Sequence, residues 1–274
     1  MTDGVFERIL ILAKTYPSPS AQHIETSCVA GINEEGAMRR LYPIPFRLLD
    51  KGKQFKKWQW IRARTVKATR DHRPESHRLF VDTLECQEWV SSRNQWNERL
   101  AWLVKIPRWA GVDSHRLPSH GNHESLMLVH PERILALEIR SCARQDWTAE
   151  EKQKLLQEQA QFKLFSEIEG GQAPAILRKV PYDFYYRYHH RTAVGIAERV
   201  HKIVDWEVAA LFWNCHRLHG KGWEAPFRRK FEEDLNNRQL MFLVGNLHRF
   251  QNQWFIVSLI YPPRPAKETA NLWQ

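Results

Sequence analysis

The sequence predicts an α+β protein, rich in β structure, with two small barrel-like units, the second carrying helical insertions. The chain has 274 residues, and at roughly 100–200 residues per domain this length favours two domains. Apolar residues alternate with a period of two over the first half, which is typical of strands. After about residue 145 helical spacing joins the strand pattern. We therefore expect a β-barrel domain over residues 1–145 and a second, barrel-like α+β domain over residues 146–274.

A hairpin is the first element that the sequence defines closely. Residues 27–32 and 37–42 are apolar, β-rich runs, and Asn33-Glu34-Glu35-Gly36 lies between them. The glycine of this connection can take the positive φ that closes a hairpin. The other elements expected before residue 145 are strands over 6–14, 57–66 and 79–86, a helical turn over 46–49, a helix over 96–104, and a hairpin or tight corner built from 126–129 and 134–139. Several short strands with little helix favour a small closed barrel.

The second half combines helices with strands. Thr148, followed three residues later by Glu151, forms a capping box that predicts a helix to about residue 165, ended by the glycine pair at 170–171. Apolar residues recur at helical spacing over residues 204–218, which predicts a buried helix. The remaining elements expected here are strands over 182–190, 239–244 and 254–261 and a helix over 223–235.

Composition excludes several classes of protein. Apolar residues make up 43% and charged residues 26% of the chain, so it has a globular rather than a disordered composition. No apolar run approaches the roughly 18 residues that a membrane helix needs, and we expect a cytoplasmic protein without membrane contact. The four cysteines lack the close C-x-x-C spacing of a zinc ribbon and are too sparse for a disulfide scaffold. We therefore expect reduced thiols.

The charge of the chain indicates a polyanionic partner. Lys plus Arg is 41 and Asp plus Glu is 31, which gives a formal net charge of +10. A positive field speeds encounter with nucleic acid, and each Lys or Arg that meets a phosphate releases a condensed counterion. The 12 Trp, 13 Phe and 7 Tyr add rings on which bases can stack. We expect nucleic acid as the partner, the alternative being a basic surface that only keeps the protein soluble.

The strand over residues 57–66 carries the strongest signal for a binding surface. Alternation places aromatic and basic side chains on one of its faces. This face holds Trp58, Trp60, Arg62 and Arg64. Rings that stack on bases, beside arginines that follow phosphates, are typical of single-strand sites. Arg39, Arg40 and Lys57 extend the positive surface. In the alternative interpretation the tryptophans belong to the core and the arginines reach solvent at one end of the strand.

The strand over residues 182–190 is also amphipathic. One of its faces is an aromatic row that we expect to be buried, formed by Tyr182, Phe184, Tyr186 and Tyr188. The opposite face presents Tyr185, Arg187 and His189 to solvent, and we include these three as candidate nucleic-acid contacts. A plain solvated surface is the alternative interpretation of the second face.

A metal centre is the main competing interpretation of the second half. The residues that suggest it are His201, Asp205, Glu207, Cys215, His216 and His219. His201 and Asp205 can share a helix face, and so can Cys215 and His219, but about 15 Å separates the two pairs along a helix axis. Each pair alone supplies fewer than the three or four protein ligands that zinc sites use. An acidic cap near the positive end of a helix dipole explains Asp205 and Glu207 equally well.

Short patterns in both halves resemble a known family. In the first half they are Leu12-Ala13-Lys14, Ser27-Cys28-Val29-Ala30-Gly31-Ile32, Arg40-Leu41-Tyr42-Pro43 and Arg73-Pro74-Glu75-Ser76. In the second half they are Val180-Pro181-Tyr182-Asp183-Phe184, His201 with Asp205-Trp206-Glu207, Gly245 with Phe255-Ile256-Val257, and Tyr261-Pro262-Pro263. Together they resemble an uncharacterised group of bacterial proteins with a dual OB-like domain, often associated with conflict or phage-defence loci. The resemblance implies two small OB-like barrels and nucleic-acid recognition, and it supplies no catalytic residue.

The function that we predict is non-enzymatic binding of single-stranded DNA or RNA, as the recognition part of a bacterial defence or mobile-element system. Protein partners of a multi-subunit system are a further option. The sequence predicts no cofactor and no metal, and the common phosphate-binding and hydrolase motifs do not occur. Two alternatives stay open: a metal-dependent nuclease or nucleotide-modifying enzyme that uses Asp205, Glu207 and nearby histidines, and a scaffold that senses a protein or a nucleotide.

Overall fold

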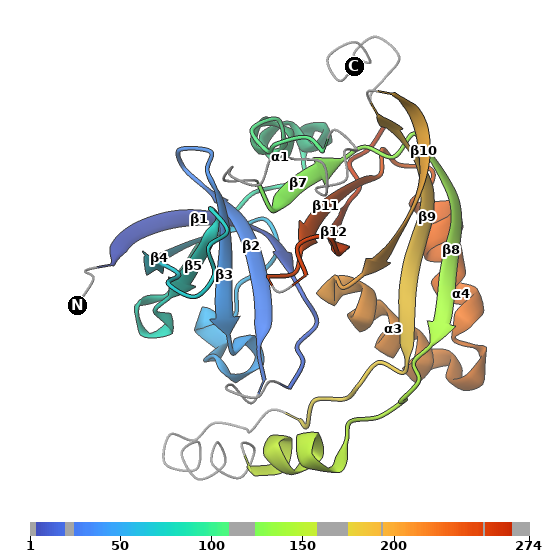
Figure 1. The fold of residues 1–274 in the computed structure, drawn as a ribbon, viewed down its shortest axis with the longest axis horizontal. Coiled ribbons are helices and arrows are strands. Elements are labelled where there is room, and N and C mark those ends of the chain that lie inside the picture. Colours follow the sequence, from blue (N-terminus) through green and yellow to red (C-terminus); the bar gives the residue numbers. More distant parts are fainter. Residues whose placement is uncertain are drawn as a thin grey trace.

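Two six-stranded β-sheets form the framework of the protein (Figure 1). The computed structural model describes residues 4–19, 25–109, 124–157, 175–192, 194–248 and 250–264. The predicted β-rich fold with few helices and two domain-like regions is confirmed.

The first sheet closes into a barrel. Its strands are β1 (Val5–Lys14), β2 (Ser27–Asn33), β3 (Met38–Ile44), β4 (Gln59–Lys67), β5 (Ser76–Leu79) and β6 (Glu85–Trp89). They pair in the order β1-β2-β3-β5-β4-β6, and an additional ladder between β1 and β4 closes five of them on themselves. The β3–β5 ladder is parallel and the others are antiparallel. The predicted hairpin of β2 and β3 is confirmed, and Gly36 in its turn has a φ of +86°.

The second sheet is open, so the barrel-like form that the sequence predicted for the second unit is not confirmed. Its strands are β7 (Leu126–Val129), β8 (Arg133–Ser141), β9 (Tyr182–Thr192), β10 (Gly195–Ile203), β11 (Met241–Asn246) and β12 (Trp254–Ile260). They pair in the order β7-β11-β12-β10-β9-β8, and the described residues contain no ladder between β7 and β8. These two strands lie at opposite edges of the sheet, so of the predicted hairpin or tight corner the hairpin is wrong, and residues 130–132 form a corner between two strands that do not pair with each other. Because both precede residue 145, the two sheets divide the chain before the boundary that the sequence predicted.

One predicted strand is interrupted. Instead of a continuous strand over 79–86, β5 ends at Leu79, a 3₁₀-helix spans Val81–Thr83, and β6 begins at Glu85. The hydroxyl of Thr83 donates to the backbone oxygen of Phe80 and accepts from the backbone nitrogen of Arg64. Such local side-chain hydrogen bonds give the backbone an alternative to a strand ladder.

The helices pack mainly on the second sheet. They are α1 (Asn97–Leu103), α3 (Trp206–His219) and α4 (Glu224–Arg229), with a π-helix at Lys230–Asp234 and further 3₁₀-helices at Phe46–Leu48, Lys51–Lys53, Asn94–Trp96 and Gly220–Gly222. Phe212 of α3 and Phe227 of α4 join the aromatic core of the second sheet. Within the described part of the chain, no helix combines the length and the apolar character needed to cross a membrane.

Residues 149–157 are also helical. The predicted capping box is confirmed, because the backbone nitrogen of Thr148 donates to the Glu151 carboxylate at 2.8 Å and the backbone nitrogen of Glu151 donates to the Thr148 hydroxyl at 3.2 Å. The predicted continuation to residue 165 and the glycine pair at 170–171 lie outside the described residues.

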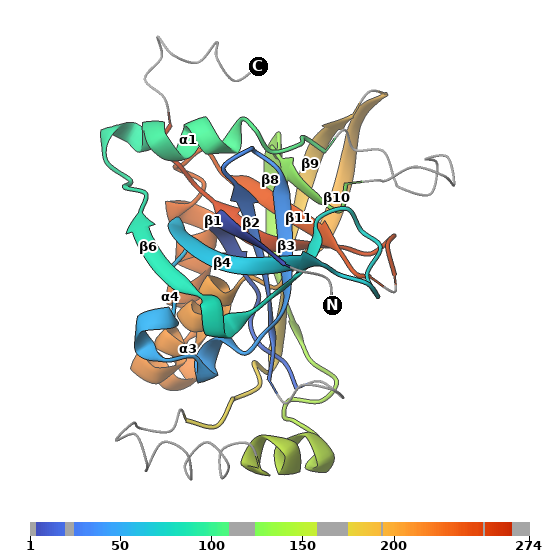
Figure 2. The same ribbon diagram turned by 90° about the vertical axis from the view of Figure 1, so that its left-hand side faces the viewer.

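An apolar core joins the two sheets. In β1, Ile9 and Ile11 belong to the barrel interior, whereas Leu10 and Leu12 belong to the core shared with β7, β11 and β12. A strand that is buried on both faces reads as a continuous apolar run rather than an alternating one. Leu243 of β11 is a member of the same shared core. The second sheet therefore covers part of the outer surface of the barrel, as Figure 2 shows with the barrel strands in front.

A buried polar network crosses the same junction. Glu75, in the loop before β5, accepts hydrogen bonds from the backbone nitrogen of Ser125 at 2.6 Å and from its hydroxyl at 2.8 Å. Arg40 donates to the backbone oxygen of Ser125 at 2.8 Å, and Arg73 donates to that of Asn246 at 2.5 Å. All five residues are buried. The loop that contains Arg73 and Glu75 therefore fastens the barrel to the second sheet.

Candidate functional site

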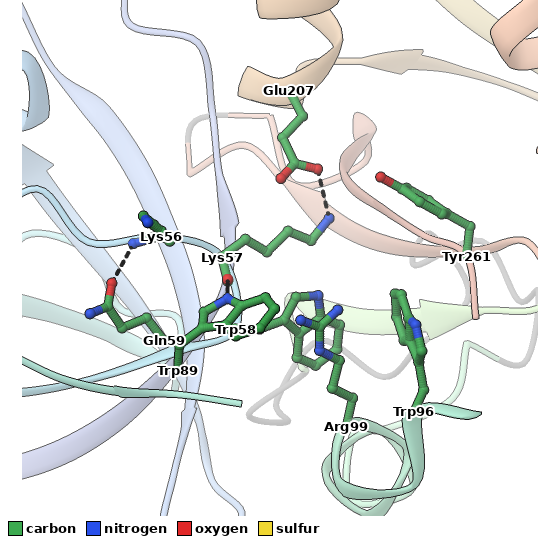
Figure 3. A pocket seen from close by; sticks show the side chains of 9 residues that line it. All are labelled: Lys56, Lys57, Trp58, Gln59, Trp89, Trp96, Arg99, Glu207 and Tyr261. Atoms are coloured by element: carbon green, nitrogen blue, oxygen red, sulfur yellow. Dashed lines mark hydrogen bonds and ion pairs between the residues drawn. The ribbon is translucent and has the colours of Figure 1, made fainter. Parts of the chain in front are cut away.

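A pocket of about 570 Å³ lies where the barrel, α1 and the second unit meet (Figure 3). This volume is in the range of pockets that hold small molecules. The lining consists of Lys56, Lys57, Trp58 and Gln59 around the start of β4, Trp89 at the end of β6, Trp96 and Arg99 near the start of α1, Glu207 in α3, and Tyr261 after β12. Residues from both units therefore complete one site.

Aromatic rings form much of the pocket wall. Trp58 and Trp96 lie edge to face with ring centroids 5.6 Å apart, and Trp96 is 6.2 Å from Tyr261. Trp58 is buried, whereas Trp89 is 49% exposed. The indole nitrogen of Trp89 donates to the backbone oxygen of Lys57 at 2.9 Å. Trp89 therefore presents a ring that is held at its nitrogen and that a planar ligand can reach from solvent.

A buried arginine lies among the tryptophans. The guanidinium carbon of Arg99 is 5.0 Å from the ring centroid of Trp58, 4.7 Å from that of Trp89 and 4.6 Å from that of Trp96. Arg99 also donates two hydrogen bonds to the backbone oxygen of Val90. Burial lowers the pKa of Arg99 to about 10, so the side chain stays cationic at neutral pH. Cation–π contacts with three rings fix this charge in the pocket wall.

The backbone around the pocket is unusual. Among the described residues, the non-glycine residues with positive φ are Trp58, Asn94, Gln95 and Trp96, at 65°, 50°, 53° and 68°. Two of them line the pocket. This region of φ is unfavourable for residues with a Cβ atom, and it persists where the surrounding structure fixes it. The packing of the site therefore holds Trp58 and Trp96 in orientations that regular strands and helices do not provide.

The polar edge of the pocket begins at the first turn of α3. Asp205 is the N-cap of this helix, and its carboxylate accepts hydrogen bonds from the backbone nitrogens of Glu207 and Leu259, both at 2.9 Å. The acidic cap that the sequence suggested is thus confirmed for Asp205. The bond to Leu259 also ties the helix N-terminus to β12.

Lys57 and Glu207 form the charged part of this edge. The Lys57 ammonium donates to the backbone oxygen of Leu259 at 2.6 Å and lies 3.4 Å from the Glu207 carboxylate and 3.9 Å from that of Asp205. Burial raises the pKa of Tyr261, so its hydroxyl is neutral at pH 7. With Lys56 and Arg99, the lining carries three cationic side chains and one carboxylate, which favours an anionic ligand.

Two of the predicted site residues, Lys57 and Trp58, line the pocket. The expected exposure of the tryptophan pair is wrong, since Trp58 is 3% and Trp60 is 6% exposed. Trp60 packs against Trp102 of α1 at a centroid distance of 5.0 Å, within the core between the sheets. Covering this face of β4 removes large indole surfaces from water. The alternative interpretation, in which the tryptophans belong to the core, is the one that the structure supports.

The arginines of the predicted surface have partners within the protein. These partners are Glu7 for Arg39, Glu85 for Arg62, the Phe80 ring for Arg64 and the backbone of Ser125 for Arg40. Arg40 is buried, and the side chain of Arg39 is 13% exposed. The expected open stripe of arginines is therefore wrong for Arg39 and Arg40, whose side chains are largely covered, whereas Arg62 stays 43% exposed beside Glu85.

The predicted residues of β9 lie outside the pocket. Three residues of the aromatic row, Phe184, Tyr186 and Tyr188, are buried as expected, and Tyr182 is partly buried. On the opposite face Tyr185, Arg187 and His189 are partly exposed. Arg187 forms ion pairs with two glutamates of the neighbouring strands β8 and β10. This face is therefore a paired, solvated surface that is separate from the pocket lining.

The candidate metal ligands do not converge. Among the described residues, no group of three or more His, Cys, Asp or Glu side chains is arranged to hold a metal ion. Asp205 caps α3 and Glu207 faces Lys57, so both carboxylates already have contacts that explain their positions. The geometry thus gives no support to the metal-dependent nuclease alternative.

Sequence reasoning missed most of the pocket. Trp89, Trp96, Arg99 and Tyr261 come from segments that were expected to be a loop, a short helix and the end of a strand. A usable signal is the density of tryptophans between residues 89 and 109, with Arg99 among them.

Two families of protein domains match the chain. Residues 6–105 match a domain of unknown function (DUF8758), and residues 114–274 match another domain of unknown function (DUF8757). Because the second match covers more than half of the sequence, the chain belongs to the DUF8757 family. No curated protein matches the sequence. The first match ends and the second begins between β6 and β7, which is also where the chain passes from the first sheet to the second.

Proposed function

We propose that the protein binds single-stranded nucleic acid, DNA or RNA, and holds one nucleotide of the strand in the pocket. The observation that carries this proposal is the presence of reachable indole rings and cationic side chains in one pocket, with Trp89 and Trp96 beside Lys56, Lys57 and Arg99. Single-strand sites combine stacking rings with cations that follow the phosphates. The net charge of +10 favours the same class of ligand.

The connectivity of the barrel supports this function. Five strands closed in the order β1-β2-β3-β5-β4, with a parallel ladder between β3 and β5, match an OB-like barrel, and we propose that fold for the first unit. OB barrels bind oligonucleotides on the face of strands 2 and 3 and on neighbouring loops. In this chain the second sheet covers residues of that face, including Ala30 and Ile32. The single-stranded nucleic acid would therefore bind at the rim of the barrel, formed by the start of β4, the end of β6 and α1.

For the biological setting we propose recognition within a bacterial defence or mobile-element system, together with any protein partners of that system. The sequence resemblance supports this part of the proposal. The pocket supports only the chemical class of the ligand, which is aromatic and anionic.

A binding measurement tests the proposed function. Fluorescence anisotropy with labelled single-stranded DNA and RNA of about twelve nucleotides should show binding that weakens steeply between about 50 and 200 mM salt. Trp89→Ala should weaken binding by roughly tenfold with little change in the salt slope, because stacking releases no counterions. Lys56→Ala should instead reduce the salt dependence of binding by the amount expected for the loss of about one phosphate contact.

Phe250→Ala is the matched control for Trp89→Ala. Phe250 is 56% exposed and lies outside the pocket lining, so its loss should change neither affinity nor salt slope. Absence of binding by the folded wild-type protein at low salt would overturn the proposal. Equal losses in the Trp89 and Phe250 variants would remove the pocket from it.

A further inference from the structure

We infer that the pocket selects guanine over the other bases, an inference that rests on the proposed function and specifies its ligand. The argument concerns the polar edge of the pocket, where the carboxylate of Glu207, the ammonium of Lys57 and the hydroxyl of Tyr261 point into the space beside the tryptophan rings (Figure 3). A base that stacks on a ring of the wall would turn its own polar edge toward these groups.

The Glu207 carboxylate has free acceptor capacity. Its side chain is 50% exposed, and only one of its two oxygens, Oε2, has a side-chain contact among the described residues, with Lys57 at 3.4 Å. A carboxylate has about four lone-pair positions on its two oxygens. Oε1 and part of Oε2 can therefore accept two adjacent N–H groups from a ligand.

The Lys57 ammonium has one donor to spare. Of its three N–H groups, one serves the backbone oxygen of Leu259 at 2.6 Å and one faces the carboxylates of Glu207 and Asp205 at 3.4 and 3.9 Å. The third can donate to a ligand oxygen. Because the Lys57 side chain is 11% exposed and its ammonium is held at Leu259, the position of this donor at the pocket edge is fixed.

The pocket thus offers two acceptors followed by a donor. Guanine presents the complementary order on its pairing edge, with N2–H and N1–H as donors beside the O6 acceptor. Adenine and cytosine each present a single amino donor next to a ring acceptor, and uracil and thymine place one donor between two acceptors. Each of these would set at least one acceptor against the Glu207 carboxylate, which is unfavourable in a partly buried site. A bidentate contact of this kind discriminates between bases by roughly ten- to a hundredfold.

Calorimetric titration of the full chain with the four nucleoside 5′-monophosphates tests the inference. GMP should bind at least tenfold more tightly than AMP, CMP or UMP. Inosine monophosphate, which lacks the N2 amino group, should bind with intermediate affinity because it keeps N1–H and O6. Glu207→Gln should bring the ratio of GMP to AMP affinity to about one, since an amide offers one acceptor and one donor. Glu198→Gln, a change at an exposed glutamate of β10, should leave the ratio unchanged.

Oligonucleotides distinguish a strand from a free nucleotide. An oligoadenylate of about twelve nucleotides is compared with the same strand in which one adenosine is replaced by guanosine. A single guanosine is used because a strand with one guanosine cannot fold into a quadruplex. Preference for the guanosine strand without measurable GMP binding supports guanine selection within a strand. Equal affinity for all bases, with the Trp89 dependence intact, overturns guanine selection and leaves the proposed function standing. No binding of either strand or nucleotide overturns both.

Discussion

The carboxylate of Glu75 accepts two hydrogen bonds from Ser125, one from its backbone nitrogen at 2.6 Å and one from its hydroxyl at 2.8 Å. The two residues are 50 positions apart, and the contact joins the loop before β5 to the start of β7. Hydrogen bonds to an ionised acceptor are roughly twice as strong as neutral ones, and both residues are buried. The contact therefore holds the second sheet against the barrel.

Glu75→Ala should lower the free energy of unfolding by about 3 kcal/mol, because it leaves two buried donors of Ser125, the backbone nitrogen and the hydroxyl, without their acceptor. Urea unfolding followed by tryptophan fluorescence measures this change. Glu85→Ala is the control within the same barrel, since its pair with Arg62 is exposed at 3.5 Å and should contribute less than about 0.5 kcal/mol. Equal effects of the two substitutions would contradict the proposed role of the network.

Trp60→Ala should destabilise the protein by about 3–5 kcal/mol, because Trp60 fills the core between the sheets beside Trp102. Trp89→Ala should cost far less, about 1 kcal/mol, since half of the Trp89 side chain is already in water. Unfolding curves of the two variants under the same conditions check the order. Similar stabilities would show that Trp60 is not a core residue.

The sequence predicted most of the strands but not the site, and the two outcomes have one physical origin. Apolar runs around a glycine-containing connection identified β2 and β3, and alternation identified β4 and β9 because each has faces of different polarity. Alternation also placed Trp60 on the same face as Arg62 correctly. It could not say what covers that face. The covering surface comes from α1 and from strands more than sixty residues further along the chain, and no local pattern reports such contacts.

The sequence did not predict the pocket, for a related reason. Its residues are brought together by long-range packing, and the orientation of Trp58 and Trp96 depends on positive φ angles that no pattern of apolar residues encodes. β10 was missed because its exposed face carries a mixture of apolar and charged residues and its burial alternates weakly. Composition did indicate the chemistry of the site, because tryptophan and arginine are the residues that form it.

Asp205→Ala should destabilise the protein by about 2–4 kcal/mol, because it removes the cap of α3 and leaves the buried backbone nitrogen of Leu259 without an acceptor. Thermal or urea unfolding measures the loss. Asp234→Ala is the control, since its pair with Lys230 is exposed on the π-helix and should change stability by less than about 0.5 kcal/mol. If Asp205→Ala left the stability unchanged but abolished a metal-dependent activity, the result would support the nuclease interpretation.

Lys14 gives a prediction for the pH dependence of stability. Its ammonium donates to the backbone oxygen of Phe55 at 2.9 Å and lies 3.6 Å from the ring centroid of Phe46, near the end of β1. Burial lowers the pKa of Lys14 from 10.5 to about 8. In the unfolded chain the side chain regains its ordinary pKa, so between about pH 8 and pH 10.5 the unfolded state binds more protons than the folded state.

The contribution of Lys14 to the free energy of unfolding should therefore rise with pH. Relative to Lys14→Met, which keeps the length of the side chain but has no charge to titrate, the wild-type protein should gain about 2 kcal/mol in unfolding free energy between about pH 7.5 and pH 10. Urea unfolding of both proteins at each pH measures the gain, and groups that titrate in both proteins cancel in the difference. If the difference in unfolding free energy between the two proteins does not depend on pH, the folded state leaves the pKa of Lys14 at its ordinary value. If the difference falls as pH rises, the aromatic rings and nearby carboxylates stabilise the charged form of Lys14 more than burial destabilises it.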